Sequence, residues 1–251
     1  YDNSGDGPNS WPHRKDSICA FIHRVDPDII DMQEVLHHQL EVLKTGLPEY
    51  TVVGVGREDG KTAGEYAPIF FKQAKYTLLD QNTFWLCEKP DSVGMVGWDA
   101  ALTRIATWVK LQDKKTGQIL MVVNTHFDHI GTEARRNSAL LIIEKIKEIV
   151  GTSPAILTGD FNVSEDWDAY KTITNNEFIL KDAHKVAGKR TGVDFTYHNF
   201  GKIPAEKCEK IDFIFVTPQI RVISSYIPFS QLNDTLFLSD HNPEIVELEI
   251  K

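Results

Sequence analysis

The chain of 251 residues is 41% hydrophobic and 25% charged, the composition of an ordinary globular protein. It carries 27 lysines and arginines against 36 acids, a net charge of −9, which argues against broad electrostatic binding of duplex nucleic acid. No apolar run reaches the roughly 18–20 residues that a membrane-spanning helix needs. The three widely spaced cysteines provide neither a disulfide scaffold nor a zinc ribbon.

The first part of the chain mixes helical and extended patterns. After a turn-rich opening over 3–9, apolar residues with helical spacing predict a helix that ends at Pro27; they are Ile18, Phe21, Ile22 and Val25. A short buried strand is expected over 28–33, and a second helix over 37–47.

Strands dominate the rest of the chain. β-Branched and aromatic residues predict strands over 50–55, 67–72, 76–79 and 103–111, and a nearly continuous apolar run predicts a central strand over 119–124. The longest helix is expected over 133–150, and further strands over 155–158, 211–216, 221–226 and 244–250. Few helices and many strands in mixed order favour a layered α/β domain, with two sheets packed on each other and helices outside. No internal boundary is visible, so residues 1–251 are interpreted as one domain.

Polar clusters lie at the ends of five apolar runs. They are Gln33-Glu34, Asn124-Thr125-His126, Gly159-Asp160-Phe161-Asn162, Ile211-Asp212-Phe213 and Ser239-Asp240-His241. Each cluster alone is compatible with an ordinary turn, a helix cap or a strand edge. Because rigid strands commonly deliver functional groups at their ends, five such clusters together predict one shared site. Carboxylate, amide and imidazole groups without cysteine suit Mg²⁺ or Mn²⁺ and a phosphate group.

These five stretches, in this order and over nearly the whole chain, resemble the endonuclease/exonuclease/phosphatase superfamily. Further stretches, Gly54-Val55-Gly56-Arg57 and Gly64-Glu65-Tyr66 among them, are similar to an uncharacterised bacterial subgroup. The resemblance implies a DNase I-like four-layer α/β/β/α sandwich that hydrolyses a phosphoester with Mg²⁺ or Mn²⁺ and an activated water. The family's first strand usually carries an asparagine that helps to bind metal or phosphate. The stretch that begins at Tyr1 does not match that strand, so the domain is expected to lack part of it.

The resemblance also implies roles for the matching residues. Glu34 would be the principal metal ligand, with Asp240 near the metal or the nucleophile. Asp160 would act as the base for the attacking water, with Asn162 beside it holding water or phosphate.

The two histidines would act on the phosphate itself. His126 and His241 are expected to contact it and to stabilise its growing charge, and Asp212 to pair with His241. Further candidates for contact with the substrate are Asn124, Arg57 and Trp98.

Other functions stay open from the residues alone. The pattern Asn124-x-His126-x-Asp128-His129 resembles the metallo-β-lactamase zinc signature with its first histidine replaced, although a zinc site leaves Glu34, Asn162 and Asp212 unexplained. A non-catalytic binding module is a second alternative.

Within the enzyme interpretation, the phosphoester is a small molecule, a lipid head group, or DNA or RNA cut by the same site. We expect a monomer, either cytoplasmic or exported after loss of an N-terminal segment.

Overall fold

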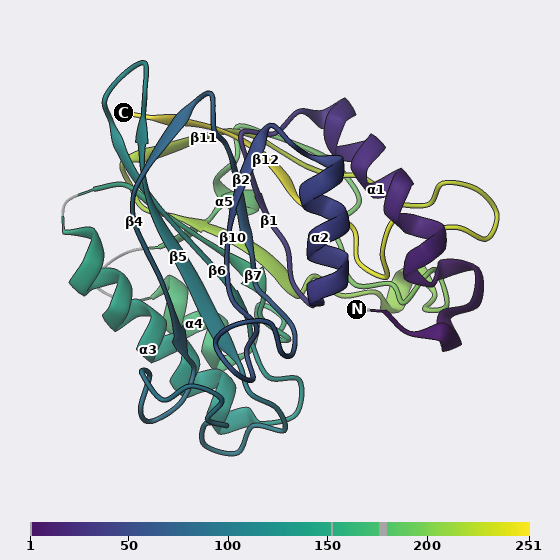
Figure 1. The fold of residues 1–251 in the computed structure, drawn as a ribbon, viewed down its shortest axis with the longest axis horizontal. Helices are drawn as coiled ribbons and strands as arrows, with labels where there is room; N and C mark the ends of the chain where they lie inside the picture. Colours follow the sequence, from purple (N-terminus) through teal and green to yellow (C-terminus); the bar gives the residue numbers. More distant parts are fainter. Residues whose placement is uncertain (1, 152, 176–179) are drawn as a thin grey trace.

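Apolar residues on both faces of strand β6 (Ile119–His126) place this strand in the middle of the fold. Side chains alternate along a strand. Leu120 and Val122 therefore join the core between the two sheet layers, while Met121 and Val123 join the core under the outer helices. The structure is a computed structural model that describes residues 2–151, 153–175 and 180–251 (Figure 1).

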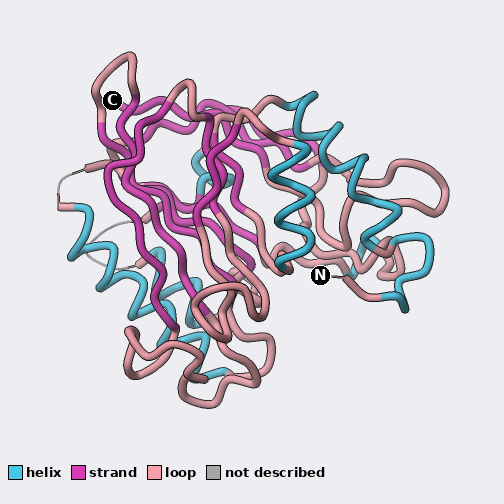
Figure 2. Tube along the Cα trace, in the orientation of Figure 1, coloured by secondary structure: helices cyan, strands magenta, loops and turns pink. Residues whose placement is uncertain are grey.

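One layer is a six-stranded sheet with β6 inside it. Its order is β4 (Tyr76–Trp85), β5 (Ile105–Asp113), β6, β7 (Ala155–Asp160), β10 (Asp212–Val216) and β8 (Lys181–Asp182). Only β6 and β7 are parallel, and the other pairs are antiparallel. Helices α3 (Thr132–Val150) and α4 (Asp168–Thr174) cover the outer face of this sheet (Figures 1 and 2).

The other layer consists of two three-stranded sheets. The first has the order β1 (Ile29–Asp31), β3 (Ile69–Lys72), β2 (Tyr50–Val53), and the second β12 (Ile245–Ile250), β11 (Ile220–Ile227), β9 (Lys189–Gly192). Helices α1 (Trp11–Val25) and α2 (His37–Gly46) pack on the first of these sheets through an apolar cluster. The layers therefore stack as α/β/β/α, as the sequence resemblance implied. The short elements η1 (Ser4–Asn9), α5 (Ala183–Val186) and η2 (Ala205–Lys207) complete the described structure.

Strands β1 and β12 are the facing edges of the two smaller sheets. Residues of both strands, together with Ile214 and the polar groups around Asp160, line one cavity of about 550 Å³. No helix in the described part of the chain is long and apolar enough to cross a membrane.

Most elements expected from the sequence are present, and the differences have local causes. β4 continues to Trp85 instead of ending at Leu79, although residues 80–83 are polar, because this edge strand pairs with β5 over its whole length around a bulge. Elements α4, α5, β8 and β9 were not predicted. They are short, and β9 is exposed at all four residues, so no apolar period marks it.

Candidate active site

The register of three neighbouring strands brings three of the predicted residues together. His126 at the end of β6 is paired with Asp160 at the end of β7, and Asp160 is paired with Asp212 at the start of β10. Residues at paired positions point to the same side of a sheet. All three side chains therefore lie on one face of the sheet, at the same end of these three strands. The approach of β6 to β7 requires glycine at Gly159, where a Cβ would lie 2.3 Å from the carbonyl oxygen of Thr125.

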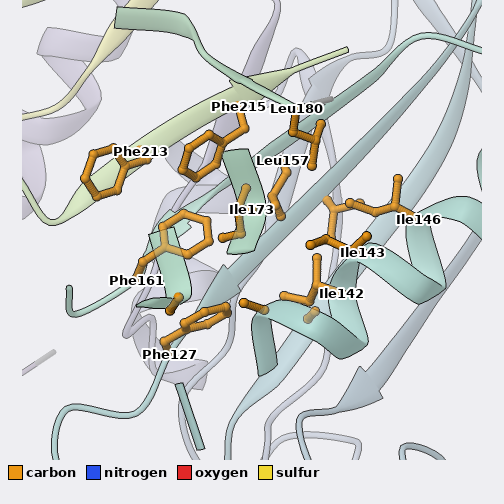
Figure 3. Close-up of a cluster of buried hydrophobic side chains, with 14 of the residues drawn as sticks. Phe127, Ile142, Ile143, Ile146, Leu157, Phe161, Ile173, Leu180, Phe213 and Phe215 are labelled. Carbon is orange, nitrogen blue, oxygen red and sulfur yellow. The ribbon is translucent and has the colours of Figure 1, made fainter. Parts of the chain in front are cut away.

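The loops after β6 and β7 are held by aromatic residues that point away from the site. Phe127 and Phe161 are fully buried and meet edge to face, with ring centroids 4.9 Å apart, in the core drawn in Figure 3. Phe161 stands between Asp160 and Asn162 in the sequence. Its burial therefore fixes the backbone that carries both of these site residues. Asn162 adopts a left-handed conformation (φ 50°), and its backbone amide donates to Oδ1 of Asp160 at 2.9 Å.

His126 lies in the middle of the cluster. Its Nε2 is 3.5 Å from Asp160 Oδ2, 3.9 Å from Glu34 Oε1 and 3.1 Å from the side-chain amide of Asn162. Burial lowers the pKa of His126 well below its usual range, and the charges of Arg104 and Arg57 lower it further. His126 is therefore a neutral imidazole at neutral pH.

His241 is in the opposite state. Its Nδ1 lies 2.7 Å from Asp212 Oδ2, and its Nε2 lies 4.0 Å from Asp160 Oδ2. Burial acts to lower the pKa of His241, but the carboxylates of Asp212, Asp160 and Asp240 together, Asp212 first among them, raise that pKa to about 10. The site thus places a neutral and a positively charged imidazole within 4.0 Å of Asp160 Oδ2.

The surroundings of Asp160 disfavour the charged form of its carboxyl group. Burial is the larger cause and repulsion from Asp212 the second, and together they raise the pKa of Asp160 to about 7. A group with such a pKa takes up and releases a proton near neutral pH, as a general base must.

Two groups of side chains could each hold a cation. One consists of Glu34, Glu65 and His126, and the other of Asp160, Asp212 and His241, with ligand atoms within 4.8 Å of one another in each group. Desolvation raises the pKa of Glu34, and the neighbouring charges of Glu65 and Asp240 raise it further. A divalent cation would relieve this repulsion, and donors made mainly of carboxylate oxygen suit Mg²⁺ or Mn²⁺.

Asp240 borders these groups without belonging to either. Its Oδ1 accepts a hydrogen bond from Ser239 at 3.0 Å, and its backbone carbonyl accepts from His198. The carboxylate acts on Glu34 and His241 through its charge.

The three further candidates for substrate contact lie in different surroundings. Asn124 is fully buried, and its side-chain amide donates to the carbonyls of Met32 and Pro68, so it ties β6 to the opposite layer instead of facing a substrate. Trp98 lines a separate depression beside Glu88 and α3. Arg57 is close to the site but is buried in an ion pair with Glu65, so it acts through its charge.

Sequence reasoning missed two residues of the site. Glu65 follows no long strand and joins Glu34 only in the folded protein. Tyr197 packs its ring against His241 at a centroid distance of 4.9 Å, and no motif marks it. The only signal in the sequence was that Glu65 belongs to a stretch shared with the bacterial subgroup.

The zinc alternative is not supported by the positions of its residues. Oδ2 of Asp128 accepts from the backbone amides of Gly131, Ile130 and Ala101, and its Oδ1 meets Arg104. Nδ1 of His129 also faces Arg104, at 3.0 Å. Asp128 and His129 therefore hold the loop after β6 and are in neither candidate ligand group among the described residues.

We expect Asp128→Asn to reduce stability. Burial acts to raise the pKa of Asp128, but the amides of Gly131, Ala101 and Ile130 and the charge of Arg104 bring it down to about 2. A carboxylate with a depressed pKa stabilises the fold above its unfolded pKa, and this contribution is lost as the pH falls through the folded pKa. The variant should therefore lose about 2 kcal/mol in the free energy of unfolding at about pH 7, and the difference should shrink toward about pH 3.

Urea titrations at several pH values measure this difference. The exposed carboxylate of Asp166, which bonds only to nearby groups, offers the control Asp166→Asn, which should leave the unfolding midpoint in place. A constant difference between wild type and Asp128→Asn across the whole pH range would contradict the assignment.

The comparisons with known proteins agree with this geometry. The sequence model of the endonuclease/exonuclease/phosphatase family matches residues 3–241, so the chain belongs to this family, whose members hydrolyse phosphoesters. It is similar to the crystal structure of an endonuclease/exonuclease/phosphatase from Bacteroides vulgatus, with 62% identity, a TM-score of 0.97, and coverage of 100% of this chain and 95% of the other.

Relatives with a stated activity include a phosphatase and an exoribonuclease. A mannosyl-6-phosphatase from Bacteroides thetaiotaomicron is 36% identical, with a TM-score of 0.93 and coverage of 99% of this chain and 96% of that one. The 3′-5′-exoribonuclease subunit of the CCR4-Not complex from Emericella nidulans is 24% identical over 88% of this chain, and the match spans only 42% of that longer protein.

Proposed function

We propose that this protein is a Mg²⁺-dependent phosphatase that removes a phosphate group from a small sugar phosphate. The observation that carries the proposal is the pair of imidazoles whose Nε2 atoms lie 3.5 Å and 4.0 Å from Oδ2 of the buried Asp160, His126 with a pKa lowered by burial and His241 bonded to the Asp212 carboxylate. Such a set suits in-line attack of water on a phosphorus atom, where a proton must be taken up on one side and negative charge stabilised on the other.

Each residue has a separate task in this proposal. Asp160 accepts the proton of the attacking water. His241, held as imidazolium by Asp212, donates a hydrogen bond to the phosphate oxygen on which charge develops. Asn162 and the neutral His126 orient the water and the phosphate beside Asp160.

Glu34 and Glu65 would hold the metal, with Asp240 beside them. A bound Mg²⁺ would neutralise phosphate charge and polarise the phosphoester. The carboxylates are near enough to share it, and the repulsion that raises the pKa of Glu34 is what a cation would offset.

The choice of a small sugar phosphate rests on charge and on similarity. The chain has a net charge of −9, and its lysines and arginines are scattered along the sequence. It therefore offers few clustered positive charges that could bind the phosphates of a nucleic acid backbone. The similar mannosyl-6-phosphatase covers nearly the whole chain, whereas the similar exoribonuclease matches over less than half of its own length.

Removal of metal tests the proposal. Dialysis against a chelator should lower mannose 6-phosphate hydrolysis by at least about 10³-fold, because the cation supplies several kcal/mol of transition-state stabilisation. Phosphate release is measured with Mg²⁺, Mn²⁺ or Zn²⁺ added back, and Mg²⁺ should restore the rate.

Two results of this experiment would contradict the proposal. One is full activity after chelation. The other is preferential cleavage of an oligoribonucleotide over the sugar phosphate by the Mg²⁺-loaded protein, which would make the exonuclease activity the better assignment.

A further inference from the structure

Tyr197 is an aromatic residue at the site that the proposed reaction does not use. Its ring is tilted by 48° against the imidazole of His241, at a centroid distance of 4.9 Å. The residue is half-buried. It is not among the residues that line the cavity between β1 and β12.

The backbone around Tyr197 is fixed to two segments that carry site residues. The amide of Tyr197 donates to the carbonyl of Glu209, and Oγ1 of Thr196 accepts from the amide of Asp212 at 3.1 Å. On the other side, the amide of His198 donates to the carbonyl of Asp240. The ring is therefore held by the same hydrogen bonds that hold Asp212 and His241, and it does not depend on a mobile loop.

The ring of Tyr197 lies beside the charged part of the site, because the His241 ring that it contacts is 2.7 Å from Asp212 Oδ2 and 4.0 Å from Asp160 Oδ2. Burial raises the pKa of Tyr197, and the charges of Asp240, Asp160 and Glu34 raise it further. Its oxygen makes no hydrogen bond to the parts of the chain that the structure describes. A rigid ring with a free hydroxyl thus stands directly beside the histidine that contacts the phosphate.

A sugar phosphate presents two different surfaces to such a residue. The C–H groups on one face of a pyranose ring are apolar and pack on an aromatic ring, while its hydroxyl groups need hydrogen-bond partners. We propose that Tyr197 is a specificity-determining residue that binds the sugar part of the substrate, with the ring packing on the pyranose face and the phenol hydroxyl bonding to a sugar hydroxyl. This inference rests on the proposed sugar-phosphate substrate and assigns the part of the site that recognises its leaving group.

Equilibrium binding tests the inference separately from turnover. In the Asp160→Asn background with Mg²⁺, calorimetric titrations give the dissociation constants of mannose 6-phosphate and of inorganic phosphate, which has no ring. We expect Tyr197→Ala to raise the ratio of the first constant to the second by about tenfold, the size of one lost aromatic contact. Tyr197→Phe should keep most of the ring contact and lose only the hydroxyl bond.

The control is Tyr226→Ala, which truncates an exposed tyrosine on β11 that is paired with Ile245 and Thr191. It should leave the ratio unchanged. An equal loss of both ligands in Tyr197→Ala would show that the ring only supports His241 and would overturn the inference, as would weaker binding of a dinucleotide with unchanged binding of mannose 6-phosphate.

A different result would contradict the proposed function. If the protein with Asp160 intact does not hydrolyse mannose 6-phosphate, the phosphatase assignment is wrong. A tenfold change of the binding ratio would still establish Tyr197 as a sugar-binding residue.

Discussion

Asp160→Asn is expected to lower kcat by about 10⁴-fold, the upper range for loss of a general base, because an amide cannot accept the proton of the attacking water. The fold should survive, since the new side-chain oxygen still accepts the amide hydrogen of Asn162. The rate of phosphate release under saturating substrate measures the effect.

The same substitution should stabilise the metal-free protein. The pKa of Asp160 is raised to about 7, so the folded state favours the protonated form. The stability that this group contributes is present below its unfolded pKa and is lost as the pH rises through the folded pKa. Above about pH 7 the charged carboxylate therefore destabilises the fold, and replacing it with a neutral amide should raise the melting temperature.

Asp31→Asn is the matched control for this prediction. Asp31 is half-buried, burial raises its pKa to about 7, and its carboxylate accepts a hydrogen bond from Thr158 but none from His126 or His241. Asp31→Asn should raise the melting temperature at alkaline pH and retain activity. Loss of activity in both variants, or a lower melting temperature for Asp160→Asn, would show that Asp160 is structural and not the base.

Asp212→Asn should reduce kcat by about 10²–10³-fold at neutral pH, the effect of losing one charged donor in an active site. The Asp212 carboxylate keeps His241 protonated up to a pKa of about 10. Without it, only Asp160 and Asp240 oppose the effect of burial, so the pKa of His241 falls and the imidazolium form is less populated at neutral pH.

The pH dependence separates this effect from simple misfolding. A His241 with a lowered pKa regains its proton as the pH falls, so the ratio of variant to wild-type kcat should rise between about pH 8 and about pH 6. Using the ratio cancels the titration of groups that both proteins share. A pH-independent ratio would mean that Asp212 positions His241 without setting its charge.

Much of the fold could be predicted because the residues within an element carry the hydrophobic pattern that marks it. The apolar run of β6 and the helical period of α3 are visible in the residues themselves. Edge elements such as β9 could not be predicted, because an exposed strand of Lys189–Gly192 carries no hydrophobic period and forms only by pairing with β11.

The sequence by itself indicated most of the groups gathered at the candidate site, because polar clusters stand at the ends of apolar runs, but it marked neither Glu65 nor Tyr197. Only the tertiary structure decided what each group does. Burial and neighbouring charges differ between His126 and His241, so one is neutral and the other charged although the residue type is the same. Glu65 and Tyr197 join the site by contacts between residues distant in the sequence, while Asn124 uses its amide to hold two layers together. Protonation and contact depend on the three-dimensional surroundings of a side chain, and sequence spacing does not encode those surroundings.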